Sequence, residues 1–302
     1  MEAPGLALNI GAVERETGLS KDVLRMWERR YGFPDPVRDD NAERLYPPDQ
    51  VAKLRAIKRL MDTGMRPGKL MRQSLAELNG LADARAGPRH DTAAPALERD
   101  IIALVKGHNA PALQHALAHL LMRQGLQRFV LETLAPLNRA VGEAWMRGEL
   151  QVFEEHLFTE QVQVTLRTAV NTFPRQTGVP RVLLTTFPGE QHGLGLLMVE
   201  ALLVPDGAQC ISLGTQTPIE DIRSAALAHK VHIVALSFSA AFPLRQAGEG
   251  LAVLRRHMAA ATALWAGGEM TRRVRKSLPG VRLIADLGDI GPALKAWRAD
   301  SG

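Results

Sequence analysis

A histidine and a carboxylate stand two positions apart in the glycine-rich stretch PGEQHGLG (188–195), which directly follows the apolar run RVLLTTF (181–187). A neutral imidazole is a good metal ligand, and the Glu190 carboxylate could accept the other ring N–H of His192 and so fix its tautomer. The stretch contains neither of the common glycine-rich patterns that cradle phosphates. Taken alone, His192 fits an ordinary loop histidine better than a ligand, because single short motifs arise by chance. The surrounding elements therefore decide between the two interpretations.

The carboxy-terminal part of the chain alternates strand-like and helical patterns. After the first run, the strand-like segments are AQCISLG (208–214), VHIVALSF (231–238), TALWAGG (262–268) and VRLIAD (281–286). This alternation predicts an α/β fold, a doubly wound parallel sheet of the Rossmann-like kind. Such sheets bind ligands beyond the carboxyl ends of their strands, and the histidine stretch falls at that place after the first strand.

The middle of the chain has a helical pattern. From Leu97 to Phe173 apolar residues recur at helical spacing, with breaks near 107–111, 125 and 147–150. Four consecutive helices with short connections predict a four-helix bundle. The preceding stretch GLADARAGPRHDTAAPA has no apolar period and predicts a linker. The predicted organisation is therefore an amino-terminal domain at 1–79, a linker at 80–96, a helical bundle at 97–175 and a sheet domain at 176–302.

The amino-terminal region carries the pattern of a helix-turn-helix. A short helix containing Ile10 and Val13 ends near Gly18, and Ser20 is placed to cap a second helix that begins at Lys21. On that second helix an apolar stripe faces inward and a basic stripe faces outward. The inward residues are Val23, Leu24 and Trp27, and the outward residues are Lys21, Arg25 and Arg29, with Arg30 at the edge.

The next stretch, FPDPVRDDNAERLY, predicts two short extended pieces joined by a turn at Asp-Asp-Asn. Such a hairpin could act as a wing, with Arg38 and Arg44 on its arms and Tyr46 at its end, within reach of DNA phosphates. The formal net charge of the chain is +5, which suits nucleic acid as a partner without requiring it. On charge alone, a solvated helix face stays open as the alternative.

Four pieces of this region together carry a specific resemblance. Arg25, WERRYG (27–32), PVR (36–38) and RLY (44–46) resemble the winged helix-turn-helix of the MerR family of transcription regulators, and the match runs from about Leu8 to Asn79. The resemblance implies that the second helix enters the major groove of operator double-stranded DNA and that the wing holds the backbone. The DNA-binding residues that it implies are Ser20, Lys21, Arg25, Arg29, Arg30, Tyr31, Arg38, Arg44 and Tyr46.

The histidine stretch carries a second resemblance. Glu190-x-His192-x-x-Gly195 resembles the D-x-H-x-x-G signature of cobalamin-binding domains. Forty-one residues separate Gly195 from Ser237, and 27 separate Ser239 from the pair Gly267 and Gly268, where that family has an S-x-L element and a Gly-Gly pair. The resemblance makes His192 the lower axial ligand of cobalt and places the displaced nucleotide tail beside Ser237 and the glycine pair. Two departures are Glu190 in place of Asp and Ser239 in place of Leu.

A third resemblance lies in the predicted bundle. Trp145, followed after nine residues by Glu155 and His156, resembles the W-x9-E-H pattern of the helical cap in cobalamin-dependent regulators of the CarH/LitR type. By this resemblance Trp145 lies over the upper face of the corrin, while Glu155 and His156 line the pocket of the 5′-deoxyadenosyl group. Met146 departs from the pattern, because light-sensing members commonly have a histidine there that ligates cobalt after the Co–C bond breaks. The histidines that could substitute are His108, His115, His119 and His156, and nothing selects one of them.

Together the three resemblances imply a cobalamin-dependent transcriptional regulator and not an enzyme. They imply adenosylcobalamin as cofactor, with other cobalamin forms open, and a homo-oligomer, from dimer to tetramer, that represses in the dark and releases DNA on illumination. RNA polymerase is an indirect partner that the resemblance leaves open. Two alternatives remain: a MerR-like regulator whose cobalamin-type module senses another ligand or only dimerises, and the corrinoid carrier of a methyltransferase, against which the helix-turn-helix argues.

Bulk properties indicate the compartment. The single cysteine, Cys210, excludes an intramolecular disulfide and fits a reducing environment. The longest apolar runs fall short of the roughly 18 residues of a membrane helix, and the amino terminus has no pattern of a secretory signal. We therefore expect a cytoplasmic protein without a membrane partner.

Overall fold

The computed structural model describes residues 7–39, 42–86, 96–174, 178–274 and 277–301. The chain forms two compact units, and the predicted bundle is divided between them. One unit holds Met1–Ile102 and Arg139–His156, and the other holds Ala103–Asn138 and Leu157–Gly302. Each unit is described by itself below.

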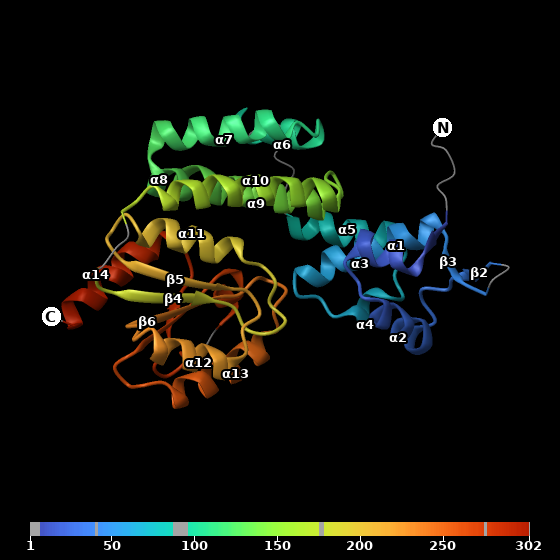
Figure 1. The fold of residues 1–302 in the computed structure, drawn as a ribbon. Helices are drawn as coiled ribbons and strands as arrows, with labels where there is room; N and C mark the ends of the chain where they lie inside the picture. The colour runs from blue at the N-terminus through green and yellow to red at the C-terminus, as the bar shows by residue number, and fades with distance from the viewer. Residues whose placement is uncertain (1–6, 40–41, 87–95, 175–177, 275–276, 302) are drawn as a thin grey trace. The chain divides into compact units, whose positions relative to one another are not determined.

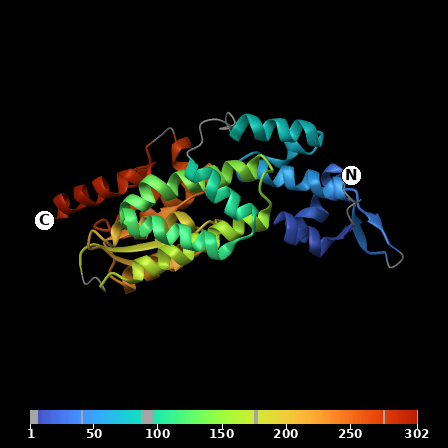
Figure 2. The same cartoon turned by 90° about the horizontal axis from the view of Figure 1, so that it is seen from above.

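The amino-terminal domain is a set of helices with a small antiparallel sheet. Its elements are β1 (Leu8–Asn9), α1 (Ile10–Thr17), α2 (Lys21–Tyr31), β2 (Val37–Arg38), β3 (Arg44–Tyr46), α3 (Pro48–Asp62), α4 (Pro67–Leu70) and α5 (Leu75–Ala86). The strand order is β1-β3-β2, and the hairpin of β2 and β3 projects from the helices of the domain in both views (Figure 1, Figure 2). The predicted helix-turn-helix and hairpin are therefore both present, although residues 40–41 of the predicted turn lie outside the described residues.

Local capping explains where α1 and α2 begin and end. The Asn9 side chain accepts the backbone N–H of Ala12, and both Gly18 and Gly32 end a helix in the left-handed conformation. Leu24 and Trp27 of α2 are buried in the core of the domain together with Leu54, Ile57 and Leu60 of α3. Burying each of these large side chains stabilises the domain by about 1.5–3 kcal/mol.

The linker prediction is wrong for its first seven residues. α5 runs from Leu75 to Ala86, and Leu78 and Ala82, one helical turn apart, are buried in the core of the amino-terminal domain. A capping box begins the helix, because Ser74 and Glu77 bond each other's backbone N–H groups. The domain therefore extends to at least Ala86. Of the rest of the predicted linker, 87–95 lies outside the described residues, and Ala96 already begins the next helix.

The middle of the chain contains the four helical stretches that the periodicity predicts. They are α6 (Ala96–Lys106), α7 (Ala110–Gln124), a continuous stretch of α8 (Leu126–Arg128), the π-helical turn η1 (Phe129–Leu134) and α9 (Ala135–Met146), and finally α10 (Val152–Asn171). The breaks at 107–111, 125 and 147–150 are confirmed. Leu113 and Leu117, at i and i+4 on α7, are fully buried, as the amphipathic pattern requires.

The carboxy-terminal part is a doubly wound parallel sheet, as predicted. The strands are β4 (Arg181–Thr185), β5 (Gln209–Gly214), β6 (Ile233–Ser237), β7 (Ala263–Gly267) and β8 (Arg282–Ile284), in the order β5-β4-β6-β7-β8. The helices α11 (Leu194–Leu203) and α14 (Ile290–Ser301) cover one face, and α12 (Ile219–Ala228) and α13 (Leu244–His257) cover the other (Figure 1). Two 3₁₀ turns, η2 (Glu269–Arg273) and η3 (Leu287–Asp289), complete this part. The chain leaves β4 toward β5 and leaves β6 toward β7, so the topological switch point lies between β4 and β6.

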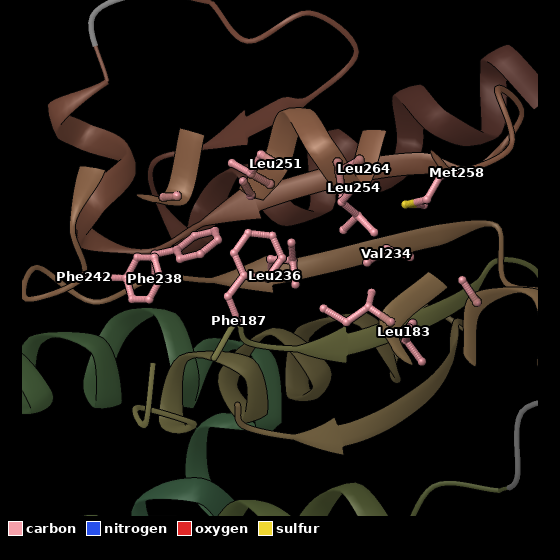
Figure 3. Packing of buried hydrophobic residues seen from close by; sticks show 14 of the residues in the cluster. Leu183, Phe187, Val234, Leu236, Phe238, Phe242, Leu251, Leu254, Met258 and Leu264 are labelled. Atoms are coloured by element: carbon pink, nitrogen blue, oxygen red, sulfur yellow. The ribbon is translucent and has the colours of Figure 1, made fainter. Parts of the chain in front are cut away.

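A core of aliphatic and aromatic side chains fixes the loops that leave β4 and β6. Figure 3 shows Leu236 of β6 facing Leu251 of α13, with Phe187, Phe238 and Phe242 grouped at one end. The ring centroids of Phe187 and Phe238 are 5.3 Å apart, in an edge-to-face arrangement. Because Phe187 follows β4 and Phe238 follows β6, this pair anchors both loops at the switch point.

Across the described ranges, no helix combines the length and the apolar character that crossing a membrane demands.

Candidate functional site

Helix α2 presents a basic face to solvent. Lys21, Arg25, Arg29 and Arg30 are exposed, and the apolar stripe on the opposite side is turned into the core. Ser20 occupies the N-cap position, where its hydroxyl accepts the backbone N–H of Val23 at 3.3 Å. The outward and inward stripes predicted from the sequence are therefore confirmed, and α2 has the form of a recognition helix.

The hairpin wing carries one exposed arginine and one that is held by α2. Arg38 is exposed and donates to the carbonyl of Ala42 at 2.8 Å. Arg44 is half-buried, and its Nε donates to Glu28 Oε2 of α2 at 2.9 Å. This hydrogen bond raises the pKa of Arg44. Arg44 therefore fixes the wing against α2.

The structure contradicts a phosphate contact for Tyr46. The Tyr46 side chain is 0% exposed, because β3 is the central strand of the small sheet and turns this ring into the core of the domain. Burial raises the pKa of the phenol, and its hydroxyl has no hydrogen-bond partner among the described residues. Sequence alone could not distinguish the two roles, because a tyrosine has both an apolar ring that packs in cores and a hydroxyl that can bind phosphates.

Two basic residues beside α2 were missed by the sequence analysis. Lys69 and Arg72 line a depression of about 500 Å³ together with Arg30 and Tyr31. Gly68 lies beside the Tyr31 ring, and a Cβ at that position would be in ordinary van der Waals contact with the Tyr31 hydroxyl, at 3.5 Å. The signal in the sequence is the spacing of three in KLMR (69–72), which places both cations on one side of a helical turn.

The loop after β4 holds Glu190 and His192 in contact. The Nδ1 atom of His192 lies 2.6 Å from Glu190 Oε1, which also accepts the backbone N–H of His192 at 3.0 Å. An ionised carboxylate can only accept, so Nδ1 carries the proton and the lone pair of the neutral ring is on Nε2. The Glu190 side chain is 1% exposed and the His192 side chain is 61% exposed. The pair therefore presents an oriented imidazole with a buried carboxylate behind it.

The second oxygen of Glu190 binds the loop after β6. Glu190 Oε2 accepts the backbone N–H of Ser239 at 2.7 Å and the Ser239 hydroxyl at 2.8 Å. Burial alone would raise the pKa of Glu190, but the hydrogen bonds from His192 and Ser239 outweigh it and lower the pKa. The carboxylate is thus ionised near neutral pH and bridges the two loops of the switch point. The two departures from the family pattern, Glu190 and Ser239, are in direct contact.

Glycines at the strand ends allow this close packing. A Cβ on Gly195 would lie 2.7 Å from Ser237 Oγ, and a Cβ on Gly268 would lie 2.3 Å from the carbonyl oxygen of Phe238. Gly268 also has φ +95°, which favours glycine. Gly267 pairs with Ser237 in the sheet. All seven residues predicted in this domain therefore meet at one edge of the sheet, and Gly195 and Gly268 accommodate neighbouring protein atoms.

Trp145, Glu155 and His156 lie in the unit that contains the amino-terminal domain. Trp145 is half-buried, and the His156 side chain is 72% exposed, with its Nε2 3.7 Å from Glu155 Oε2. Trp145 also lines a small cavity with residues of α1 and α3, a contact that the sequence pattern did not reveal. Within the described ranges no three His, Cys, Asp or Glu side chains gather as a metal site.

Comparison with known proteins identifies a family for the amino-terminal domain and another for the helical middle of the chain. Residues 8–72 match the family described as MerR HTH family regulatory protein, and residues 97–168 match the B12 binding domain. The sheet-containing part has the fold of the monomethylamine corrinoid protein of Methanosarcina barkeri, with a TM-score of 0.54 at 11% identity, over 66% of this chain and 96% of that chain. This last likeness concerns the fold alone.

Two transcriptional regulators are similar over most of the chain. The HTH-type transcriptional repressor CarH of Myxococcus xanthus is 31% identical over 265 residues, which are 84% of this chain and 86% of the relative. The repressor CarA of the same organism is 28% identical and covers 77% of each chain. Both named relatives are transcriptional repressors and not enzymes. The protein therefore belongs to the family of MerR-type transcriptional regulators that carry a B12-binding domain.

Proposed function

We propose that this protein is a light-responsive transcriptional repressor that binds operator DNA as an adenosylcobalamin-loaded oligomer in the dark. The observation that carries the proposal is the bridge made by Glu190 between His192 and Ser239 at the switch point of the sheet. A buried carboxylate that orients an exposed imidazole is the arrangement expected behind a metal ligand. The same chain carries a helix-turn-helix with a basic face.

The residues of the sheet domain fit a cobalt corrinoid. A corrin ring supplies four nitrogen ligands to cobalt, so the protein needs to add only one, and His192 is the exposed imidazole at the switch point. Ser237 and the glycine pair stand at the neighbouring strand ends, where the nucleotide tail of the cofactor would lie. When bound, adenosylcobalamin supplies a visible chromophore with a light-sensitive Co–C bond.

Three residues of the bundle complete the proposed cofactor site. By resemblance, Trp145 covers the upper face of the corrin, and Glu155 and His156 receive the 5′-deoxyadenosyl group. The support for this assignment is the W-x9-E-H spacing and the exposure of His156. Met146 offers a thioether where light-sensing relatives have an imidazole, so we expect a photoproduct that differs from theirs.

The proposed DNA interface combines the basic face of α2 with the basic residues beside it, which would contact phosphates. Lys21, Arg25 and Arg29 would reach the major groove, and Arg30 with Lys69 and Arg72 would contact the backbone. When several DNA-binding domains of low individual affinity are joined in one oligomer and bind repeated half-sites, operator affinity rises. This would link oligomer size to repression. RNA polymerase would be affected indirectly, through occupation of the operator.

The test is the visible spectrum of the purified protein after incubation with adenosylcobalamin in darkness and desalting, recorded before and after green light. We expect retained corrinoid absorbance that changes on illumination. His192→Ala should weaken retention and alter the spectrum of the bound corrinoid, whereas His229→Ala, at an exposed histidine of the same domain, should not. No retained absorbance in the wild type would overturn the cobalamin proposal and leave a regulator whose carboxy-terminal module takes another ligand or only dimerises.

A further inference from the structure

The turn that joins α9 to α10, residues 147–151, belongs to the same compact unit as the amino-terminal domain and lies against α1 and α3. A small cavity of about 10 Å³ lies between them at this place, the room of about one water. It is lined by Arg55, Lys58 and Arg59 of α3 on one side and by Trp145, Leu150 and Gln151 on the other. We call residues 147–151 the docking turn.

The docking turn is held in a fixed shape by its own contacts. Arg147 Nε donates to Glu149 Oε1 at 2.7 Å, and an ion pair of 3.9 Å joins Arg147 to Glu143 of α9. The backbone N–H groups of Gly148 and Glu149 donate to carbonyls of α9, and Gly148 has φ +74°. A displacement of α9 would therefore carry the docking turn with it.

Arg59 of α3 is the residue that meets the docking turn. A Cβ at Gly148 would lie 3.5 Å from Arg59 Nη2, so the guanidinium lies beside the carboxyl end of α9. The partial negative charge of a helix carboxyl end favours a cation there. Arg59 Nη2 also donates to Asn79 Oδ1 of α5 at 3.3 Å. One side chain thus connects α3, α5 and the docking turn.

The contact is finely balanced. Burial lowers the pKa of Arg59, the Arg55 cation lowers it further, and Arg59 Nε has no hydrogen-bond partner among the described residues. The favourable helix end is therefore opposed by the lost hydration of the guanidinium. Release of the docking turn would return Arg59 to water, so the buried guanidinium opposes docking while the helix end favours it.

Trp145 lies on the last turn of α9, three residues before Gly148 of the docking turn. We propose that the docking turn is the surface through which the cofactor site controls the amino-terminal domain, with Arg59 as the residue that senses its position. This inference rests on the proposed role of Trp145 at the cofactor. Coupling of this kind is reciprocal, so DNA binding would change cofactor affinity by the same factor.

Hydrogen–deuterium exchange in darkness, with and without adenosylcobalamin, tests this coupling in the full chain. In the wild type we expect loading to change exchange in both 56–60 of α3 and the docking turn by at least about fivefold, the lower end of usual coupling factors. In Arg59→Met, which keeps the apolar stem, the α3 response should fall to within roughly twofold while retention of the corrinoid is unchanged. Arg99→Met removes an exposed arginine of the same unit and should respond like the wild type.

The outcomes separate this inference from the proposed function. Retained corrinoid with an undiminished α3 response in Arg59→Met overturns the docking inference alone. Failure of the wild type to retain corrinoid overturns the proposed function, and the inference with it. Gly148→Ala provides a second variant, because a Cβ at φ +74° strains the docking turn without touching the core of the amino-terminal domain. It should reduce the α3 response as Arg59→Met does.

Discussion

Glu190 serves two partners with its two oxygens, and this explains two sequence departures together. A shorter aspartate would have one methylene less with which to span His192 and the backbone of Ser239, and a leucine at 239 would offer no hydroxyl to the second oxygen. The backbone N–H of Ser239 binds this oxygen as well, so the hydroxyl is an additional donor. The longer acid and the added hydroxyl are therefore complementary.

Replacing the carboxylate should weaken cofactor binding through His192. Glu190→Gln removes the charge that orients the imidazole, and we expect corrinoid affinity to fall about 10–100-fold, as for other partners of metal ligands. Ser239→Ala should have a smaller effect, because the backbone donor remains. Titration of the proteins with adenosylcobalamin in darkness measures both. Ser224→Ala, which removes an exposed hydroxyl of α12, is the control, and equal affinity in Glu190→Gln and this control would contradict the assigned role.

A second histidine of the sheet domain has a structural role that depends on pH. His232 Nδ1 accepts the backbone N–H of Arg181 at 2.9 Å, which requires that nitrogen to be unprotonated. Burial lowers the pKa of His232, and the Arg181 cation lowers it further. Because the folded pKa is below the unfolded value of about 6.5, this contribution is complete above that pH and is lost as pH falls through the folded pKa.

The Arg181 amide reports this titration. The pH is lowered from 7.5, and the exchange rates are corrected for the pH dependence of intrinsic amide exchange. The protection of this amide should then decrease at pH values below about 6.5. In His232→Leu, which cannot accept, the protection should be low at every pH and independent of it. His229→Leu, at an exposed neighbouring histidine, should retain the pH dependence. A wild-type protection that does not vary with pH would show that this bond is unimportant.

At the scale of elements, periodicity and capping residues predicted most of the fold. The five apolar runs became the five strands of the sheet, and Ser20 begins α2 as its type and position indicate. α5 was missed because its sequence, LAELNGLADARA, has a weak apolar pattern, and its two buried residues are recognisable only against α3. The contact of Trp145 with the amino-terminal domain joins residues far apart in the chain, so no local pattern could reveal it.

The assignment of α5 to the amino-terminal domain has a direct consequence for stability. Leu78 is 0% exposed in the core of that domain, so Leu78→Ala should destabilise it by about 2–5 kcal/mol. The loss is measured by thermal unfolding of the full chain, with hydrogen exchange of the α3 amides as the probe of the amino-terminal domain. Leu227→Ala on α12, where the side chain is 60% exposed, should leave α3 unaffected. Equal α3 protection in both variants would show that α5 does not contribute to the core of the amino-terminal domain.

At the scale of the whole molecule, the proposed functional residues are distributed over the two described units. The residues proposed to contact DNA and those proposed to cover the cofactor, Trp145, Glu155 and His156, belong to one unit, whereas the proposed cobalt ligand belongs to the other. The sequence could identify each set from its motif, but it could not show that the bundle is divided in this way.

The size of the assembly is the property on which the proposed light response depends. One helix-turn-helix makes few base contacts, and joining several on repeated half-sites can raise apparent affinity by about 10²–10⁴-fold. Sizing by light scattering should therefore show a larger species with adenosylcobalamin in darkness and a smaller one after green light, with operator affinity falling in parallel. Protein without cofactor, illuminated in the same way, should keep its size. If the loaded protein has one mass in darkness and in light, either Met146 has removed the light response or dissociation of the oligomer is not the switch, and the proposed link between oligomer size and repression is wrong.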